Sequence, residues 1–185
     1  MLDAMQAQMR WSQLGGGPGV AASGLAWLAA GLVAERGASD LAAFGVLFAG
    51  GMLIVPLALL ASRLFGRSGG PAPLGKLGFE ATMTLFAGLF VGFCLLFVTP
   101  DLAIPLVAVV VGARYAVFAS IYGNLAFYAL GAAIAGLGAV AAIGLAVLPL
   151  HVAVLVGVVE IVAGLALTAA ALRASRPDAQ ARPAG

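Results

Sequence analysis

The sequence contains one cysteine, Cys94, one histidine, His151, and few charged residues. A single cysteine excludes a disulfide within the chain, and one cysteine with one histidine is too few for a Cys/His zinc cluster. No Ser/His/Asp arrangement and no pair of aqueous carboxylates suggests catalysis, so an enzyme is the least favoured class and no cofactor or metal is expected. No basic helix interleaved with aromatic residues is present, which argues against nucleic-acid binding.

Long apolar runs make up most of the sequence. The chain is 63% hydrophobic and 9% charged, with a mean hydropathy of +1.14. A soluble domain has about 25% charged residues, and about 20 apolar residues cross the roughly 30 Å of a bilayer core. Because lipid offers no partner to backbone polar groups, each run is expected to be a helix. Six transmembrane helices are predicted, over 20–34, 41–62, 77–98, 102–122, 125–147 and 150–172. The fold class is therefore an all-α polytopic membrane helix bundle with short loops.

The first run is the shortest and is expected to extend from Leu14 or to thin the bilayer locally. We expect it to be retained rather than cleaved as a signal peptide.

Basic residues lie on one set of connections. With six spans, one face carries Arg10, Arg63, Arg67, Lys76, Arg173, Arg176 and Arg182, whereas the other has Arg36. Because excess Lys and Arg stay in the cytoplasm, both termini are predicted to be cytoplasmic in a multi-pass protein of a prokaryotic inner membrane. His151 is expected at the outer interface.

The chain divides into three parts. In 1–19, Leu2, Met5 and Met9 recur at helical spacing and predict an interfacial helix, with a frayed polar tail as the alternative, and 15–19 form a Gly-rich hinge. Residues 20–172 form the transmembrane domain, and 173–185 are predicted to be a disordered cytoplasmic tail. The segment 70–76 fits the start of a phosphate-binding loop, but Leu77 replaces the Ser/Thr and no strand precedes it, so nucleotide binding is not expected.

Two stripes of small residues predict close helix packing. They are Glu80, Thr84, Gly88 and Gly92 in one span, and Ala153, Gly157, Glu160, Gly164 and Thr168 in another. Both carboxylates are therefore expected to face protein. The Ala/Gly-rich span 125–147 is expected to lie centrally.

Arg114 and Glu160 lie near the middle of their spans, at depths that differ by roughly 3 Å at 1.5 Å per residue. Glu80 is nearer the cytoplasmic end and is the second choice of partner for Arg114. One interpretation is a structural clamp in which Arg114 bonds a carboxylate. The other is functional, in which Arg114 binds an anionic group or sets the proton affinity of Glu160 in a transport pathway.

Aromatic and polar residues gather around Arg114. Tyr115 lies deep in its span and needs a hydrogen-bond partner, so it joins Arg114, Glu160 and Glu80 as a candidate of the substrate or ion pathway. Tyr122 is expected at the cytoplasmic interface. Pro56 and Pro105 free backbone carbonyls within their helices and predict a cavity.

Several short segments carry a resemblance. Pro73-Leu74-Gly75-Lys76-Leu77-Gly78, followed by Gly112-Ala113 and Ile121-Tyr122, resembles an uncharacterised family of small bacterial multi-helix membrane proteins. The resemblance implies a prokaryotic polytopic membrane protein and no particular chemistry.

Two functional classes remain. The first is a transporter, channel-like or substrate-binding bundle with an intramembrane Arg/Glu site and a small anionic or proton-coupled substrate. The second is a non-catalytic membrane partner subunit or assembly factor. Beyond the lipid bilayer, the candidate partners are a second copy of the chain or another membrane subunit.

Overall fold

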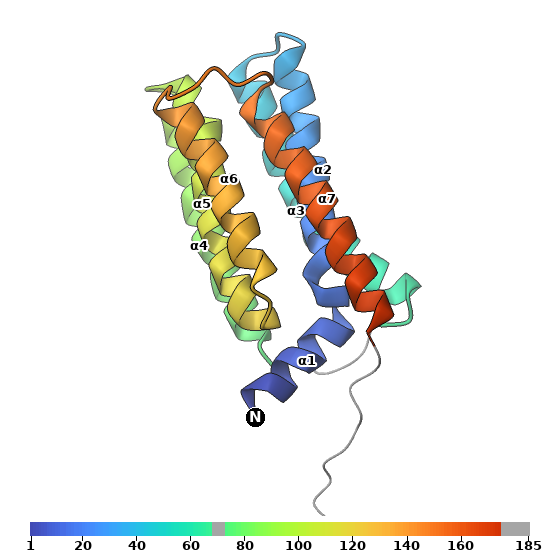
Figure 1. The fold of residues 1–185 in the computed structure, drawn as a ribbon. Coiled ribbons are helices and arrows are strands. Elements are labelled where there is room, and N and C mark those ends of the chain that lie inside the picture. The colour runs from blue at the N-terminus through green and yellow to red at the C-terminus, as the bar shows by residue number, and fades with distance from the viewer. Residues whose placement is uncertain (68–72, 175–185) are drawn as a thin grey trace, which may run out of the picture.

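The computed structural model describes residues 1–67 and 73–174, and within them the chain is entirely helical (Figure 1). The α-helices are α1 (Leu2–Ser12), α2 (Gly17–Glu35), α3 (Asp40–Leu64), α4 (Gly75–Leu95), α5 (Pro100–Tyr122), α6 (Ala126–Ala142) and α7 (Val152–Arg173), and a short 3-10 helix, η1 (Leu14–Gly16), joins α1 to α2. An all-α bundle is confirmed. Residues 175–185, most of the predicted tail, and 68–72 of the loop before α4 lie outside the described residues.

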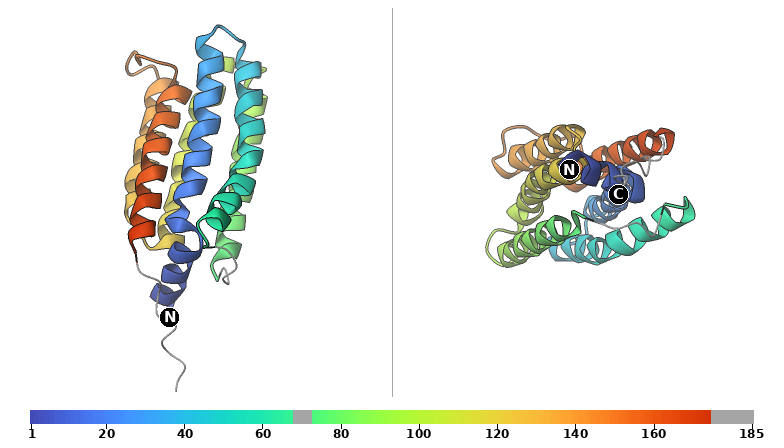
Figure 2. Two further views of the ribbon diagram at one scale, coloured as in Figure 1. Left: turned by 90° about the vertical axis from the view of Figure 1, so that its right-hand side faces the viewer. Right: turned by 90° about the horizontal axis from the view of Figure 1, so that it is seen from below.

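The six long helices form two groups. Helices α2, α3 and α7 pack together on one side, and α4, α5 and α6 on the other, with α1 lying across one end (Figures 1 and 2). The most extensive interfaces are α2 with α7 and α5 with α6. The buried core lies between the groups and includes Trp27, Ile104, Tyr115 and Phe127.

Glycines allow α2 and α7 to approach backbone to backbone. A Cβ at Gly24 would lie 2.7 Å from the backbone nitrogen of Ile161, and one at Gly157 would lie 2.6 Å from that of Leu28. These contacts confirm that the small stripe of α7 is a packing surface. Its partner on α2 consists of Gly17, Gly24 and Gly31, a seven-residue repeat that the sequence analysis missed.

The expectation that span 125–147 lies centrally is wrong. Helix α6 packs chiefly on α5, through Gly131 and Gly138, while Ala129, Ala132 and Ala133 are exposed. A high Ala/Gly content permits close packing but does not determine which face is covered.

In the described part of the chain, five helices are long and apolar enough to cross a membrane, and α6 is shorter, with 17 residues. The predicted end of that span, Val147, is wrong by five residues. Gly144 adopts a left-handed conformation, with φ of 63°, and Leu145 N–H donates to the Val140 carbonyl, which closes the helix. Because the apolar run continues past Gly144, hydropathy alone did not mark this boundary.

The N-terminal segment is helical, as one of its two sequence alternatives predicted. Met9 and Leu14 are buried against the bundle. The predicted hinge over 15–19 differs from the structure, in which Gly15 and Gly16 form a tight turn with positive φ and Gly17–Gly19 belong to the first turn of α2.

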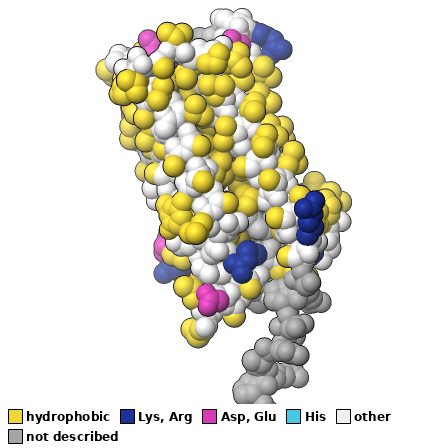
Figure 3. All heavy atoms as spheres, in the orientation of Figure 1, with side chains coloured by type: hydrophobic (Ala, Val, Ile, Leu, Met, Phe, Trp, Pro, Cys, Tyr) yellow, Lys and Arg dark blue, Asp and Glu magenta, His cyan; other side chains and the backbone are white. Residues whose placement is uncertain are grey.

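Charge separates toward the two ends of the bundle. Arg10, Arg63, Arg67, Lys76 and Arg173 lie at the end covered by α1, which we call the basic end, and most of the Lys and Arg visible in Figure 3 lie there. The opposite, acidic end carries Glu35, Asp40 and Asp101, with Arg36. Each long helix runs antiparallel to the next, so every second connection lies at the same end of the bundle. The basic residues therefore gather at one end.

His151 caps α7 at the acidic end. The His151 Nδ1 accepts a hydrogen bond from the Ala153 backbone N–H at 3.2 Å. The backbone N–H of His151 donates to Glu35 Oε1. Burial lowers the pKa of the His151 imidazole below its ordinary 6.5, while Glu35 and Asp40 oppose that shift. The half-buried histidine is therefore a helix cap and not merely a solvated surface residue.

Acidification is expected to destabilise α7 through His151. Because the pKa is depressed in the folded state, the neutral imidazole contributes stability above pH 6.5 that is lost as pH falls through the folded pKa. His151→Asn replaces the capping Nδ1 by an amide oxygen that accepts the same bond but does not titrate, so its melting temperature in detergent should vary less between pH 7.5 and pH 5 than that of the wild type. Loss of the cap is worth about 1 kcal/mol. Parallel pH profiles of the two proteins would contradict this expectation.

Candidate functional site

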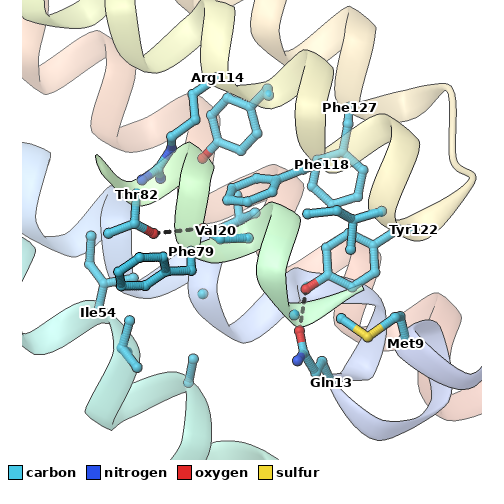
Figure 4. Close-up of a pocket in the computed structure, with 18 of the residues that line it drawn as sticks. Met9, Gln13, Val20, Ile54, Phe79, Thr82, Arg114, Phe118, Tyr122 and Phe127 are labelled. Atoms are coloured by element: carbon cyan, nitrogen blue, oxygen red, sulfur yellow. Dashed lines mark hydrogen bonds between the residues drawn. The ribbon is translucent and has the colours of Figure 1, made fainter. Parts of the chain in front are cut away.

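A cavity of about 390 Å³ lies between the two helix groups near the basic end. We call it the Arg114 cavity, after the residue at its inner end (Figure 4). Its wall is mostly apolar, with polar side chains from α3, α4 and α5 and from the segment before α2. The polar lining residues are Gln13, Ser62, Thr82, Arg114, Tyr115 and Tyr122.

Arg114 is half-buried on α5, eight residues or about 12 Å from the basic end of that helix. Its guanidinium carbon lies 5.0 Å from the centre of the Phe118 ring, and the group points toward Thr82 of α4 (Figure 4). The Nε atom is buried with no hydrogen-bond partner among the described residues. An arginine stays charged even when buried, so a cation without a bonded anion lines this cavity.

Tyr115 and Glu160 meet behind the cavity wall. The Tyr115 hydroxyl donates to Glu160 Oε1 at 2.6 Å, and both side chains are 0% exposed. Ser23 of α2 lies beside both groups. Glu160 Oε2 has no hydrogen-bond partner in the part of the chain that the structure describes. The sequence expectation that Tyr115 needs a partner is met by this bond, which joins α5 to α7.

The predicted candidates are thus brought together only in part. Across residues 1–67 and 73–174, no carboxylate lies within 4.0 Å of Arg114, so the direct Arg114–Glu160 clamp is not formed, although the two charges interact at longer range. The prediction that Glu80 faces protein is wrong. Its side chain is 55% exposed and pairs with Lys76 at 3.8 Å, one turn away on the same helix.

An aromatic wall, made of Tyr115, Phe118 and Tyr122 of α5 and Phe127 of α6, lines one side of the cavity. The Phe127 ring stacks on Tyr122 with centroids 5.3 Å apart and on Tyr115 at 6.0 Å. Tyr122, at the basic end of α5, is buried, and its hydroxyl donates to Gln13 Oε1 at 2.6 Å, so the segment before α2 covers its side chain. Phe127 was missed because a lone aromatic in an apolar span carries no distinguishing pattern.

The segment before α2 forms the floor of the cavity. Met9 and Gln13 line it, and α1 is held on the end of α5 by two hydrogen bonds, from Gln6 to the Ser120 carbonyl and from Arg10 to the Tyr122 carbonyl. The floor covers the end of α5 at the basic end, where Gln13 bonds Tyr122 (Figure 4).

The side of the cavity between α3 and α4 is open. Toward the basic end these helices diverge, because α3 packs mainly on α2 and α4 on α5 (Figures 1 and 2). Three apolar lining residues are largely exposed there: Val55 is 59%, Leu59 53% and Phe79 63% exposed. Pro56 lies within this stretch of α3, as the prediction of a cavity near a helix proline indicated.

No cluster of three His, Cys, Asp or Glu side chains suited to a metal ion is found among the described residues. The chemistry of the cavity therefore lies in one cation, several hydroxyl and amide groups, and a large apolar surface. Such a surface can bind an anion.

One family match covers nearly the whole chain. The model of a family described as "Family of unknown function (DUF7010)" matches residues 2–170. No curated protein and no solved structure matches. The resemblance to an uncharacterised family is thus confirmed. Since that family has no known function, the function is inferred from the geometry of the site.

Proposed function

The chain belongs to this family of unknown function, and we propose that it is a transporter or substrate-binding membrane bundle whose ligand site is the Arg114 cavity. One observation carries the proposal: a permanently charged guanidinium lines a cavity and has no carboxylate within 4.0 Å in the described ranges. Buried charges in proteins are normally paired, since an isolated one is costly. An anionic ligand would supply the missing pair.

The arrangement of the carboxylates supports an anionic ligand over a cationic one. Glu160 lies behind the aromatic wall, hydrogen-bonded to Tyr115, and does not line the cavity. Glu80 also lies outside it, paired with Lys76. Arg114 therefore dominates the field inside the Arg114 cavity. Glu160 acts on a ligand indirectly, through its longer-range charge interaction with Arg114 and its hydrogen bond with Tyr115.

We place this site in a prokaryotic inner membrane, with six crossings and both termini in the cytoplasm. The five long apolar helices support the location. At 1.5 Å per residue α6 spans roughly 25 Å, which suits a crossing where the bilayer thins. The basic end, which includes α1 and the end of α7, supports a cytoplasmic position for both termini.

The second candidate, a partner subunit or assembly factor, is favoured by one surface. Helices α3 and α4 expose Phe48, Phe86, Phe90 and Phe93. Lipid covers such a face in a monomer, whereas a second copy or another membrane subunit would cover it in a complex. This alternative does not use the unpaired charge of Arg114.

Ligand-induced stabilisation separates the two candidates. Purified protein in detergent is mixed with phosphate, sulfate, acetate, decanoate or palmitate, and melting temperatures are compared. We expect at least one anion to stabilise the wild type, by about 2.7 kcal/mol at a hundredfold excess over Kd. The shift should disappear in Arg114→Gln and persist in Arg173→Gln, a matched control because Arg173 is an exposed arginine at the same end. Equal shifts in all three proteins, or none in the wild type, would favour the partner-subunit function.

A further inference from the structure

The Arg114 cavity is closed toward the basic end and open toward the side. Gln6, Arg10 and Gln13 bind α1 and η1 to α5, and so the floor separates Arg114 from the aqueous phase at that end. Among residues 1–67 and 73–174 no comparable hydrogen bonds close the lateral side, where α3 and α4 diverge and apolar lining residues on both edges are exposed. A ligand that enters by this side comes from the surrounding lipid.

The lining of the Arg114 cavity is also divided in chemistry. The charged group lies at the inner end, while Ile54, Val55 and Leu59 of α3 and Phe79 of α4 form an apolar path toward the opening. A small hydrophilic anion would neutralise Arg114 but would leave that apolar path without a partner. A molecule with an anionic head and an apolar tail matches both parts.

The size of the Arg114 cavity limits the ligand. At about 390 Å³ it lies near the lower end of the roughly 300–1,000 Å³ found for small-molecule sites. One acyl chain fits such a space with its far end leaving through the opening, whereas a lipid with two chains and a large head group does not fit.

From these three features we infer that the ligand is a single-chain anionic amphiphile, such as a fatty acid, that enters from the lipid between α3 and α4 and places its carboxylate on Arg114. This inference rests on the proposed function and specifies its substrate class and route. The head pairs with the guanidinium, and the chain lies against the apolar residues of α3 and α4.

Two substitutions test the inference at separate points. Arg114→Gln removes the cation. Gly78→Leu fills the cavity, because a Cβ at Gly78 has ordinary contact at 3.8 Å with Ile121 and a larger side chain extends into the space beyond. Its control is Gly136→Leu on α6, where a Cβ meets nothing within 4 Å and the helix is exposed. Leucine favours a helix over glycine at both sites.

The experiment reconstitutes the full chain in phosphatidylcholine vesicles with a palmitate analogue that carries a diazirine in its chain, and maps the labelled peptides by mass spectrometry. In the wild type, Arg173→Gln and Gly136→Leu, we expect labelling of α3 near 54–59 and of α4 near 78–82. Arg114→Gln should reduce that labelling by about tenfold or more, the lower end for a lost hydrogen bond to a charged group. Gly78→Leu should also reduce it, because the leucine side chain occupies the space of the acyl chain. The corresponding long-chain amine with the same diazirine should not label these peptides.

Two results would overturn the inference: equal labelling of all five proteins, or equal labelling by the amine. If phosphate, sulfate or acetate stabilises the wild type through Arg114 while palmitate neither stabilises nor labels it, the inference fails and the proposed function stands. If no anion acts through Arg114 in either experiment, both fail.

Discussion

Gly24→Leu is expected to destabilise the bundle by about 3 kcal/mol or more, since overpacking typically costs about 1–3 kcal/mol even where side chains can move aside. Here the obstacles are backbone atoms, because a Cβ at Gly24 would lie 2.7 Å from Ile161 N and 2.8 Å from the Gly157 carbonyl oxygen. Helices α2 and α7 would have to separate along their largest interface. Denaturation in mixed detergent micelles, followed by circular dichroism, measures the loss.

Gly136→Leu is again the matched control, since it makes the same chemical change on an open face. It should leave stability unchanged or raise it by up to about 1 kcal/mol through helix propensity. If both variants were equally stable, α2 and α7 would not lie as close as their glycines indicate.

Tyr115→Phe is expected to cost about 1.5–3 kcal/mol, because it removes the hydrogen bond that Glu160 accepts and leaves that carboxyl group buried without one. Glu160→Leu removes the other partner, and the double variant should be more stable than the sum of the single effects predicts. The double-mutant cycle should give a coupling within the range of about 0.5–3 kcal/mol typical of residues in contact. Tyr128→Phe, on the exposed face of α6, is the control.

The same cycle with Arg114→Leu and Glu160→Leu should give a smaller coupling, since these charges lie beyond salt-bridge distance. Additive effects of Tyr115→Phe and Glu160→Leu would contradict the observed pairing. A coupling of Arg114 with Glu160 larger than that of Tyr115 would instead restore the direct clamp predicted from their depths.

The depth of each charged residue was predictable from sequence, but its direction was not. Counting residues along two spans placed Arg114 and Glu160 at similar depths. Adjacent residues on a helix point about 100° apart, so Tyr115 turns toward α7 while Arg114 turns into the cavity. Which of the two meets Glu160 depends on how α5 is rotated against its neighbours, and one sequence does not fix that rotation.

The positions of the spans were predictable because hydropathy reports the length of each apolar helix. Of the interface between α2 and α7, only the α7 side was predicted. The small residues of α7 identified a close interface, because they recur at intervals of three and four residues. Gly24 and Gly31 of α2 are seven residues apart and do not show that pattern. Glu80 shows the opposite error, since it shares a stripe of four-residue spacing with Gly88, two turns later in α4, but its own side chain is exposed and pairs with Lys76.

The contact between α2 and α7 also determines the order in which this chain can be completed. A ribosome makes α2 before α3, α4, α5 and α6, and α7 after them, so the glycine face of α2 stays without its partner until those four helices have been synthesised. Helix α1 also cannot be anchored early, because Gln6 and Arg10 donate to carbonyls more than 100 positions later in the chain. Until α7 has been synthesised, the nascent chain has helices but no closed bundle. During this interval chaperones can bind it and proteases can cleave it.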